Sequence, residues 1–162
     1  MIDLHDHLIS KHSWNGRCNA SGLAIIETCE GFSATVYRCP ANVPTIGYGS
    51  TYDYEGVKVT MVHPTITEME ASVLLANEIR HTEKTIRKLV AVPLSENQFS
   101  ALCSLIYNIG SGNFQRSTLR SRLNRGDYEG ASAEFPKWRR GGGKILKGLV
   151  TRRAIERELF DT

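Results

Sequence analysis

Residues 30–49 read EGFSATVYRCPANVPTIGYG, and this stretch decides the fold of the 162-residue chain. Just before it, residues 21–30 have the pattern of a helix, with Ser21 as the expected N-cap and Gly31 as the C-cap. Within and after it, short β-prone pieces between residues 35 and 60 alternate with proline and glycine, which predicts a small antiparallel sheet with tight turns. Glu30 then lies at the C-terminal end of a helix, where the dipole disfavours a carboxylate that is not solvated, paired with a cation or partly protonated.

The chain after the predicted sheet has helical patterns. Capping boxes at Thr67 with Glu70 and at Ser95 with Gln98 predict two long helices, the first ending before Pro93 and the second at Gly110. Two shorter helices are expected at 119–124 and 128–135, the second closed by Pro136. A flexible glycine loop at 141–143 then precedes a final helix whose apolar residues are Leu149, Ile155 and Leu159.

These elements predict an α+β fold, with a small sheet lobe at about 32–62, a larger helical lobe at about 63–162 and a cleft between them. Residues 21–162 are expected to form a single domain and residues 1–20 an N-terminal extension. The chain is long enough to bury a core without disulfides, and its 41% hydrophobic and 23% charged composition is that of a soluble globular protein. The longest uncharged run, at 97–115, contains too many polar residues for a membrane span.

Charge and cysteine usage narrow the possible functions further. Residues 115–162 carry 12 basic and 6 acidic side chains, which indicates either a face for an anionic partner or a solvated helical surface. The four cysteines are too few for a disulfide scaffold and lack the paired spacing of a zinc site. We expect no metal and no cofactor, and we discount the N-terminal cluster of His5, His7, His12, Asp3 and Asp6 as a metal site.

Three residues in and around the opening stretch could meet in one cleft. Glu30 ends the helix, Cys39 follows nine positions later on an expected strand, and Thr45 lies six further on, on the next strand. A helix end and two adjacent strands can converge on one site. This pattern resembles the phage-type lysozymes (endolysins) of glycoside hydrolase family 24, which have a Glu-Gly at a helix end, an Asp or occasionally a Cys nine residues later, and a Thr six after that.

The resemblance extends over roughly Gly22 to Phe160 and includes several further motifs. They are, in chain order, TIGYGST, SENQFSALCSLIYNIGSGNF, STLRSRLNRGDYEGASAEF, Trp138, GGGKILKGL, and Arg152 with RAIERELF. The resemblance implies a lysozyme-like fold and hydrolysis of the β-1,4 bond between N-acetylmuramic acid and N-acetylglucosamine in bacterial peptidoglycan, causing lysis of the host cell. It also implies catalytic roles for Glu30, Cys39 and Thr45.

The chemistry of these side chains agrees with that activity. Cleavage of a glycoside needs a proton donor for the leaving oxygen, so Glu30, at a helix end in a cleft wall, is expected to be the general acid. Cys39 stands where most of the family has an aspartate, and a thiol with a pKa of about 8.5 supplies little negative charge at neutral pH. Cys39 could therefore act as a thiolate nucleophile, as a base, or only as a hydrogen-bonding neighbour of a water that Thr45 orients.

The resemblance suggests further residues for the site. Gln98, Asn108, Asn113 and Thr118 are weaker candidates for contact with the substrate, and either Arg152 or Arg153 could be the cationic partner of Glu30. A membrane-released subset of these endolysins is held inactive by a disulfide to the active-site cysteine. A similar switch here would pair Cys39 with Cys29 or Cys18, although the apolar N-terminal anchor of that subset is absent from this chain.

Other functions remain as alternatives. Cys39 with His63 could serve a peptidoglycan peptidase or amidase. The basic run KWRRGGGK at 137–144 could bind nucleic acid, and an inactive protein that only binds the cell wall is a third alternative. For the lysozyme we expect a monomer without a signal peptide, made in the host cytoplasm, which acts on peptidoglycan and is attracted to an anionic wall or membrane surface, with no specific nucleic acid as partner.

Overall fold

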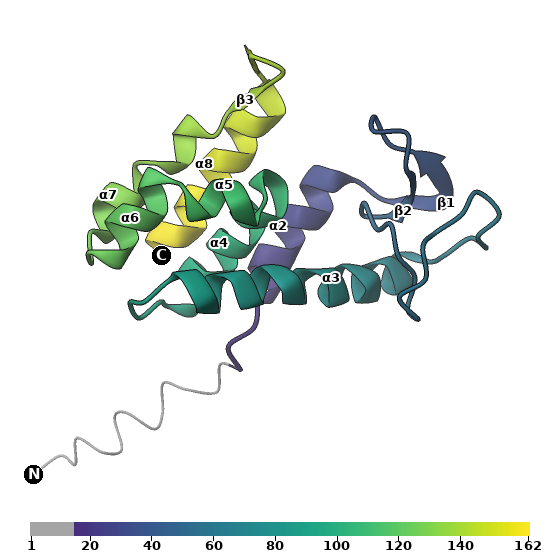
Figure 1. Cartoon of the computed structure of the whole chain (residues 1–162), viewed down its shortest axis with the longest axis horizontal. Coiled ribbons are helices and arrows are strands. Elements are labelled where there is room, and N and C mark those ends of the chain that lie inside the picture. Colours follow the sequence, from purple (N-terminus) through teal and green to yellow (C-terminus); the bar gives the residue numbers. More distant parts are fainter. Residues whose placement is uncertain (1–14) are drawn as a thin grey trace, which may run out of the picture.

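The computed structural model describes residues 15–162, whose helices and strands are arranged as in Figure 1. In chain order they are α2 (Ala20–Glu30), β1 (Ser33–Arg38), β2 (Pro44–Gly47), α3 (Glu68–Leu89), α4 (Glu96–Ile109), α5 (Ser111–Gln115), α6 (Thr118–Asn124), α7 (Tyr128–Ser132), the 3-10 turn η1 (Phe135–Lys137), β3 (Arg140–Gly141), β4 (Lys144–Ile145) and α8 (Lys147–Asp161). The α+β class with a small antiparallel sheet is confirmed. The division into residues 1–20 and 21–162 stays a prediction, and residues 1–14 lie outside the described part of the chain.

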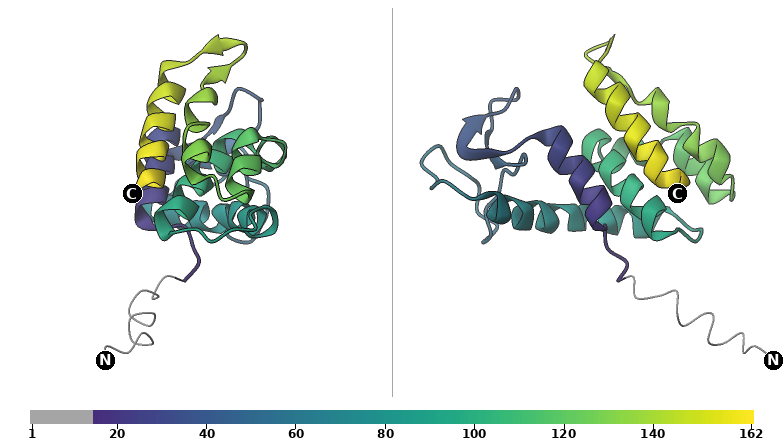
Figure 2. Two further views of the ribbon diagram at one scale, coloured as in Figure 1. Left: turned by 90° about the vertical axis from the view of Figure 1, so that its left-hand side faces the viewer. Right: turned by 180° about the vertical axis from the view of Figure 1, so that it is seen from behind.

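The core is built around α4, whose residues 99–106 are all buried. This helix packs against α2, α3 and α8, and smaller helices cover its remaining side. Figures 1 and 2 show α3 running from this group of helices to the sheet, so the long helix joins the two lobes. Both predicted capping boxes, at the start of α3 and of α4, are confirmed, because in each the side-chain and backbone hydrogen bonds are made.

The sheet lobe pairs β1 with β2 in antiparallel register, with Tyr37 opposite Thr45. The expected third piece, at 57–60, contributes an isolated bridge between Tyr52 and Lys58 rather than a full strand. Between the two strands the chain turns tightly through Asn42, whose positive φ of 63° is a conformation that asparagine tolerates better than most residues. The expectation that Cys39 lies on a strand was wrong, because β1 ends at Arg38 and Cys39 begins this turn, where its backbone N–H donates to Val43 O at 3.0 Å.

Several local predictions were wrong, each for a physical reason. The N-cap of α2 is Asn19 rather than Ser21, because the Asn19 side chain accepts the Gly22 N–H at 3.0 Å. Pro136 does not close α7, which ends at Ser132; it lies inside η1, where proline near the first position costs no hydrogen bond. The glycine triplet forms the tight turn of the β3–β4 hairpin, with positive φ at Gly142 and Gly143. The pattern also gave no sign of α5.

The final helix differs most from its predicted pattern. The face of α8 that is buried against the core carries Arg152, Arg153 and Glu156 together with Phe160, whereas Ile155 is 41% exposed. Buried charges of this kind require partners, and the partners lie at the end of α2 and on α4. Within residues 15–162 no helix is long and apolar enough to cross a membrane.

Candidate active site

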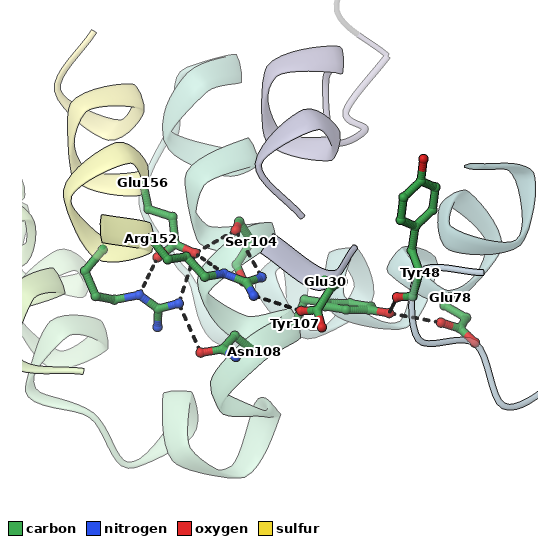
Figure 3. Close-up of polar contacts among 9 residues, drawn as sticks. Glu30, Tyr48, Glu78, Ser104, Tyr107, Asn108, Arg152 and Glu156 are labelled. Carbon is green, nitrogen blue, oxygen red and sulfur yellow. Dashed lines mark hydrogen bonds and ion pairs between the residues drawn. The ribbon is translucent and has the colours of Figure 1, made fainter. Parts of the chain in front are cut away.

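Helix α2 ends at Glu30 and so carries this carboxylate to the junction of the two lobes (Figure 3). Gly31 caps the helix with a φ of 74°, and its N–H donates to Glu27 O at 3.0 Å. The Glu30 side chain is 29% exposed, and its Oε1 accepts a hydrogen bond from Arg152 Nη1 at 2.8 Å. Of the environments expected for a carboxylate at a helix end, the structure therefore shows pairing with a cation, and the cation is Arg152.

Arg152 is itself held rigidly behind Glu30. The side chain is 4% exposed, and its Nε donates to Glu156 Oε1 at 3.1 Å while its Nη2 donates to Ser104 O at 3.2 Å. Hydrogen bonding to Glu30 and the nearby carboxylates raise the pKa of Arg152 against the opposing effect of burial. The guanidinium is therefore a fixed positive charge with one donor committed to Glu30.

Arg153, the other candidate partner of Glu30, points elsewhere. It is fully buried, its Nε lies 2.8 Å from Glu156 Oε2, and its Nη2 donates to Asn108 Oδ1 at 3.0 Å. Asn108 in turn lines two neighbouring cavities, one of 660 Å³ that also touches Glu30 and one of 310 Å³ that also touches Trp138. The two consecutive arginines thus bind different side chains, since Arg152 binds Glu30 and Arg153 binds Asn108.

On the sheet lobe, Cys39 and Thr45 lie together. Backbone N–H groups of Val43 and Ala41 and the Thr45 hydroxyl lower the pKa of the Cys39 thiol, against a smaller effect of desolvation. Thr45 is buried, and its hydroxyl donates to Val43 O at 2.9 Å. Because a hydroxyl has a single proton, Thr45 can satisfy either that carbonyl or a Cys39 thiolate at one time.

Tyr37 was not identified from the sequence, although it lies near both Cys39 and Glu30. The register of β1 with β2 places Tyr37 opposite Thr45, and Cys39 follows two positions later, just after the end of β1. Burial raises the pKa of Tyr37, and the charges of Cys39 and Glu30 raise it further, so its hydroxyl lies within electrostatic range of both groups. A tyrosine two positions before the cysteine is the sequence signal that could have found it.

A second polar cluster lies on the side of Glu30 away from Arg152, toward α3 (Figure 3). Tyr107 Oη, on α4, donates to Glu78 Oε2 at 3.1 Å and lies 3.5 Å from the backbone oxygen of Tyr48. Burial, and then the charges of Glu78 and Glu30, raise the pKa of Tyr107 above its ordinary value. These residues come from three elements far apart in the chain, so no sequence pattern marked them.

The weaker substrate-contact candidates are placed differently from one another. Asn108 and Asn113 both line the 310 Å³ cavity beside Trp138. Gln98 is at the opposite end of α4, about 15 Å along the helix axis from Asn108, and its Oε1 accepts the Ser95 N–H of the capping box. Thr118 begins α6 with an exposed side chain. Gln98 and Thr118 are not among the residues that line the two cavities.

All four thiols are free in the structure. Cys18 is buried in the core, where its thiol interacts with that of Cys103, and it lies beyond the N-terminal end of α2, a helix about 16 Å long. Cys29 is exposed next to Glu30. A disulfide from Cys39 to Cys29 or Cys18 stays a prediction, and the Cys18 pairing would require that residue to leave the core.

The alternative chemistries gain no support from the described residues. His63 Nδ1 lies 2.8 Å from Pro64 O, whereas the groups that bond the Cys39 thiol are those of the turn and Thr45. Residues 15–162 contain no cluster of His, Cys, Asp or Glu that could hold a metal. The histidines and aspartates considered at the N-terminus lie outside the described residues.

Comparisons with known proteins agree with this geometry. The phage lysozyme family model matches residues 27–156. An endolysin of Acyrthosiphon pisum secondary endosymbiont phage 1 is 39% identical over 145 residues, covering 87% of this chain and 95% of the relative, and the endolysin of Salmonella phage P22 is 38% identical over 142 residues, covering 88% and 96%.

Solved structures lead to the same family. The crystal structure of a P22 lysozyme variant aligns with a TM-score of 0.82 at 36% identity, covering 90% of this chain and 99% of that one. The muramidase domain of SpmX from Asticaccaulis excentricus aligns with a TM-score of 0.78 at 29% identity, covering 90% and 98%. The lysozyme-like architecture expected from the sequence is therefore confirmed, and the chain belongs to the phage lysozyme family.

Proposed function

We propose that Glu30 is the proton donor of a muramidase that hydrolyses the β-1,4 bond between N-acetylmuramic acid and N-acetylglucosamine in peptidoglycan. The chain is a lysozyme of the endolysin type. The assignment of the proton-donor role to Glu30 goes beyond what that family membership shows. The observation that carries it is the ion pair of Glu30 with the buried Arg152 at the edge of a 660 Å³ cavity.

The geometry suits proton donation by one carboxyl oxygen. Arg152 occupies Oε1, and residues 15–162 form no hydrogen bond to Oε2. A sugar bound in the cleft would exclude water from the exposed part of the side chain, and loss of water favours the uncharged, proton-bearing form. Oε2 would then give its proton to the glycosidic oxygen as the bond to the muramic acid carbon breaks.

Cys39 and Thr45 would act on the other side of the broken bond. Because its neighbours lower the pKa of Cys39, a larger fraction of the thiol is ionised than in an ordinary cysteine. This favours the two roles that need a thiolate. The thiolate either takes a proton from a water that attacks the sugar carbon, or attacks that carbon itself and is later displaced by water. In both cases Thr45 can turn its hydroxyl toward the thiolate or the water.

A lysis assay tests the assignment. Chloroform-treated Gram-negative cells should clear with the wild type and stay turbid with Glu30→Gln, which keeps the shape and the hydrogen bond to Arg152 but cannot donate a carboxyl proton. Cys39→Asp, which supplies a charged group, should keep more activity than Cys39→Ser. Full clearing by Glu30→Gln contradicts the proposal, and a wild type that leaves the cells turbid favours a wall-binding or nucleic-acid-binding protein.

We also propose that the exposed cations of the β3–β4 hairpin and its flanks attract the monomeric enzyme to an anionic wall or membrane surface, after its synthesis in the host cytoplasm. Arg152 and Arg153 are buried, so the exposed positive charge of this region comes from other residues, namely Arg139, Arg140, Lys144 and Lys147. Changing these four to Gln should slow lysis at low salt, and the difference from the wild type should disappear at high salt, where exposed charges are screened. An equal loss at both salt concentrations contradicts this part of the proposal.

A further inference from the structure

Glu156 is a fully buried carboxylate in the middle of α8 that the proposed reaction does not touch. Its Oε1 accepts hydrogen bonds from Ser104 Oγ at 2.6 Å, Arg152 Nε at 3.1 Å and Arg153 Nη2 at 3.2 Å. Its Oε2 lies 2.8 Å from Arg153 Nε. One carboxylate therefore binds both guanidinium groups and a helix α4 hydroxyl at once (Figure 3).

A buried cluster of charges contributes little net stability to a fold. Removing three charges from water carries a large desolvation cost, and well-packed apolar side chains in the same volume often stabilise a protein equally well. The cluster nevertheless has a second property, because each arginine has a donor left over. Arg152 Nη1 reaches Glu30 Oε1 at 2.8 Å, and Arg153 Nη2 also reaches Asn108 Oδ1 at 3.0 Å.

We propose that Glu156 is the positioning residue of the cleft, which holds Arg152 on the proton donor Glu30 and Arg153 on the cleft-lining amide of Asn108. The inference rests on the proposed role of Glu30. Without Glu156 the two guanidinium groups, adjacent in the chain and both positive, would repel each other and lose their shared acceptor. Their donors to Glu30 and Asn108 would then no longer be fixed.

The contact with Asn108 has a chemical consequence for substrate binding. An amide whose Oδ1 accepts from Arg153 must present its Nδ2 as a donor. Asn108 lines both cavities of the cleft, so that donor is available to an acceptor on the substrate, such as a carbonyl or hydroxyl oxygen of an N-acetylated sugar. Glu156 thereby sets which polar group Asn108 offers, although it never contacts the substrate.

Glu156 also sets the charge that Glu30 experiences. The groups around Glu30 are Arg152 on α8, which is hydrogen-bonded to it, and Cys29 on α2, Tyr37 on β1 and Tyr107 on α4, which lie within electrostatic range of its carboxylate. Glu156 does not contact Glu30 but shares its negative charge between Arg152 and Arg153. When its charge is removed, Arg152 keeps one compensating carboxylate fewer beside Glu30, and an uncompensated cation favours loss of a proton from a neighbouring acid.

The test compares kcat, KM and the pH–activity profile on soluble glycan chains for the wild type, Glu156→Gln and Glu156→Asp. Glu158→Gln is the matched control, since Glu158 is exposed on the same helix and the substitution removes the same charge. We expect Glu156→Gln to lower kcat by roughly 10- to 100-fold, as a misplacement of about 1 Å can do. The alkaline limb of the profile should move to lower pH, because the charge of Arg152 is less compensated in this variant. Glu156→Asp should restore part of both properties, and Glu158→Gln should change neither.

Circular dichroism and thermal unfolding report whether each variant is folded. If Glu156→Gln does not fold, Ser104→Ala carries the test, because it removes the 2.6 Å hydrogen bond to Glu156 without changing any charge. It should lower kcat several-fold and leave the pH limb in place, and a wild-type kcat in this variant overturns the proposal.

Two results with folded Glu156→Gln also overturn the proposal. One is a kcat and pH profile equal to those of the wild type. The other is a loss of activity that matches the loss of folded protein and leaves the pH limb unmoved, which would assign Glu156 a purely structural role. Glu30→Gln is measured alongside to distinguish the proton-donor role of Glu30 from the positioning role of Glu156. Activity in Glu30→Gln contradicts the proposed function itself, whatever the result with Glu156→Gln.

Discussion

At the scale of single residues, neighbours rather than residue type decide what each side chain of the site can do. The thiols illustrate this. Backbone N–H groups lower the pKa of Cys39, whereas burial raises the pKa of Cys29 and, far more strongly, that of Cys103. Four residues of one type thus divide into a reactive group, a weakly reactive one and a buried pair.

This difference predicts the order in which the thiols react with an alkylating reagent. Because the thiolate is the reactive form, Cys39 should be labelled by iodoacetamide at a lower pH than Cys29, and Cys18 and Cys103 should react only after unfolding. Peptide mass spectrometry over a pH series measures this order. Lytic activity should fall in proportion to the labelling of Cys39. The variant Cys29→Ser should show the same relation between labelling of Cys39 and loss of activity. Labelling of Cys29 before Cys39 contradicts the prediction.

At the scale of elements, the site depends on close packing between α2, which carries Glu30, and α4, which carries Ser104 and Asn108. Gly22 lies at a close contact between these helices. A Cβ added there would lie 2.7 Å from Cys18 Sγ and 2.8 Å and 2.9 Å from Ser100 Cβ and O. A glycine in a helix is therefore required here by packing, despite its low helix propensity.

Gly22→Ala should consequently destabilise the fold by about 1–3 kcal/mol, because overpacking outweighs the gain in helix propensity. Gly148→Ala is the control within α8, where an added Cβ meets nothing within 4 Å. That change should be neutral or stabilise by up to about 1 kcal/mol. Urea unfolding of both variants measures the two effects, and equal stabilities would show that α2 and α4 can separate without cost.

The same elements show how far the sequence predicts the structure. The caps of α3 and α4 were predictable because a capping box is local, with both partners within four residues. The cap of α2 was not, because Asn19 is selected over Ser21 by bonds to residues about 80 positions away: its N–H donates to Ser100 Oγ and its Nδ2 to Asn97 Oδ1.

The candidate site likewise contains residues that the sequence predicts and residues that it does not. The spacing of Glu30, Cys39 and Thr45 was readable from the sequence, and the structure pairs Cys39 with Thr45. The buried side of α8 was mispredicted because a hydrophobicity pattern treats arginine as a surface residue. Arg152 and Arg153 are buried because Glu156 on the same helix and tertiary partners on α2 and α4 bind them. The choice of Arg152 over Arg153 depends on the same contacts.

At the scale of the whole molecule, α3 joins the lobes and Glu78 lies where they meet. Burial raises the pKa of Glu78, against opposing hydrogen bonds from Tyr107, Ser50 and Thr51. A carboxyl whose pKa is higher in the folded than in the unfolded state stabilises the fold most at low pH. That contribution is lost as pH rises from about 4.3, the ordinary glutamate value, through the raised pKa.

Glu78→Gln should therefore become more favourable, relative to the wild type, as the pH of unfolding experiments rises from 4 to 7. Glu70 on the same helix is the control of opposite sign, because the Thr67 hydrogen bonds of its capping box lower the pKa of Glu70. Glu70→Gln should become less favourable over the same range. Parallel pH dependences for the two variants contradict the roles given to these carboxylates.

The central claim is that Glu30 donates the proton that cleaves a glycosidic bond, and product analysis on purified peptidoglycan tests it most directly. Borohydride reduction after digestion converts each newly exposed reducing end of N-acetylmuramic acid to its alcohol, which mass spectrometry counts. The wild type should produce these ends at a rate matching solubilisation of the wall, and Glu30→Gln should produce almost none. New amino groups without new reducing ends, or undiminished reducing ends from Glu30→Gln, would contradict the account.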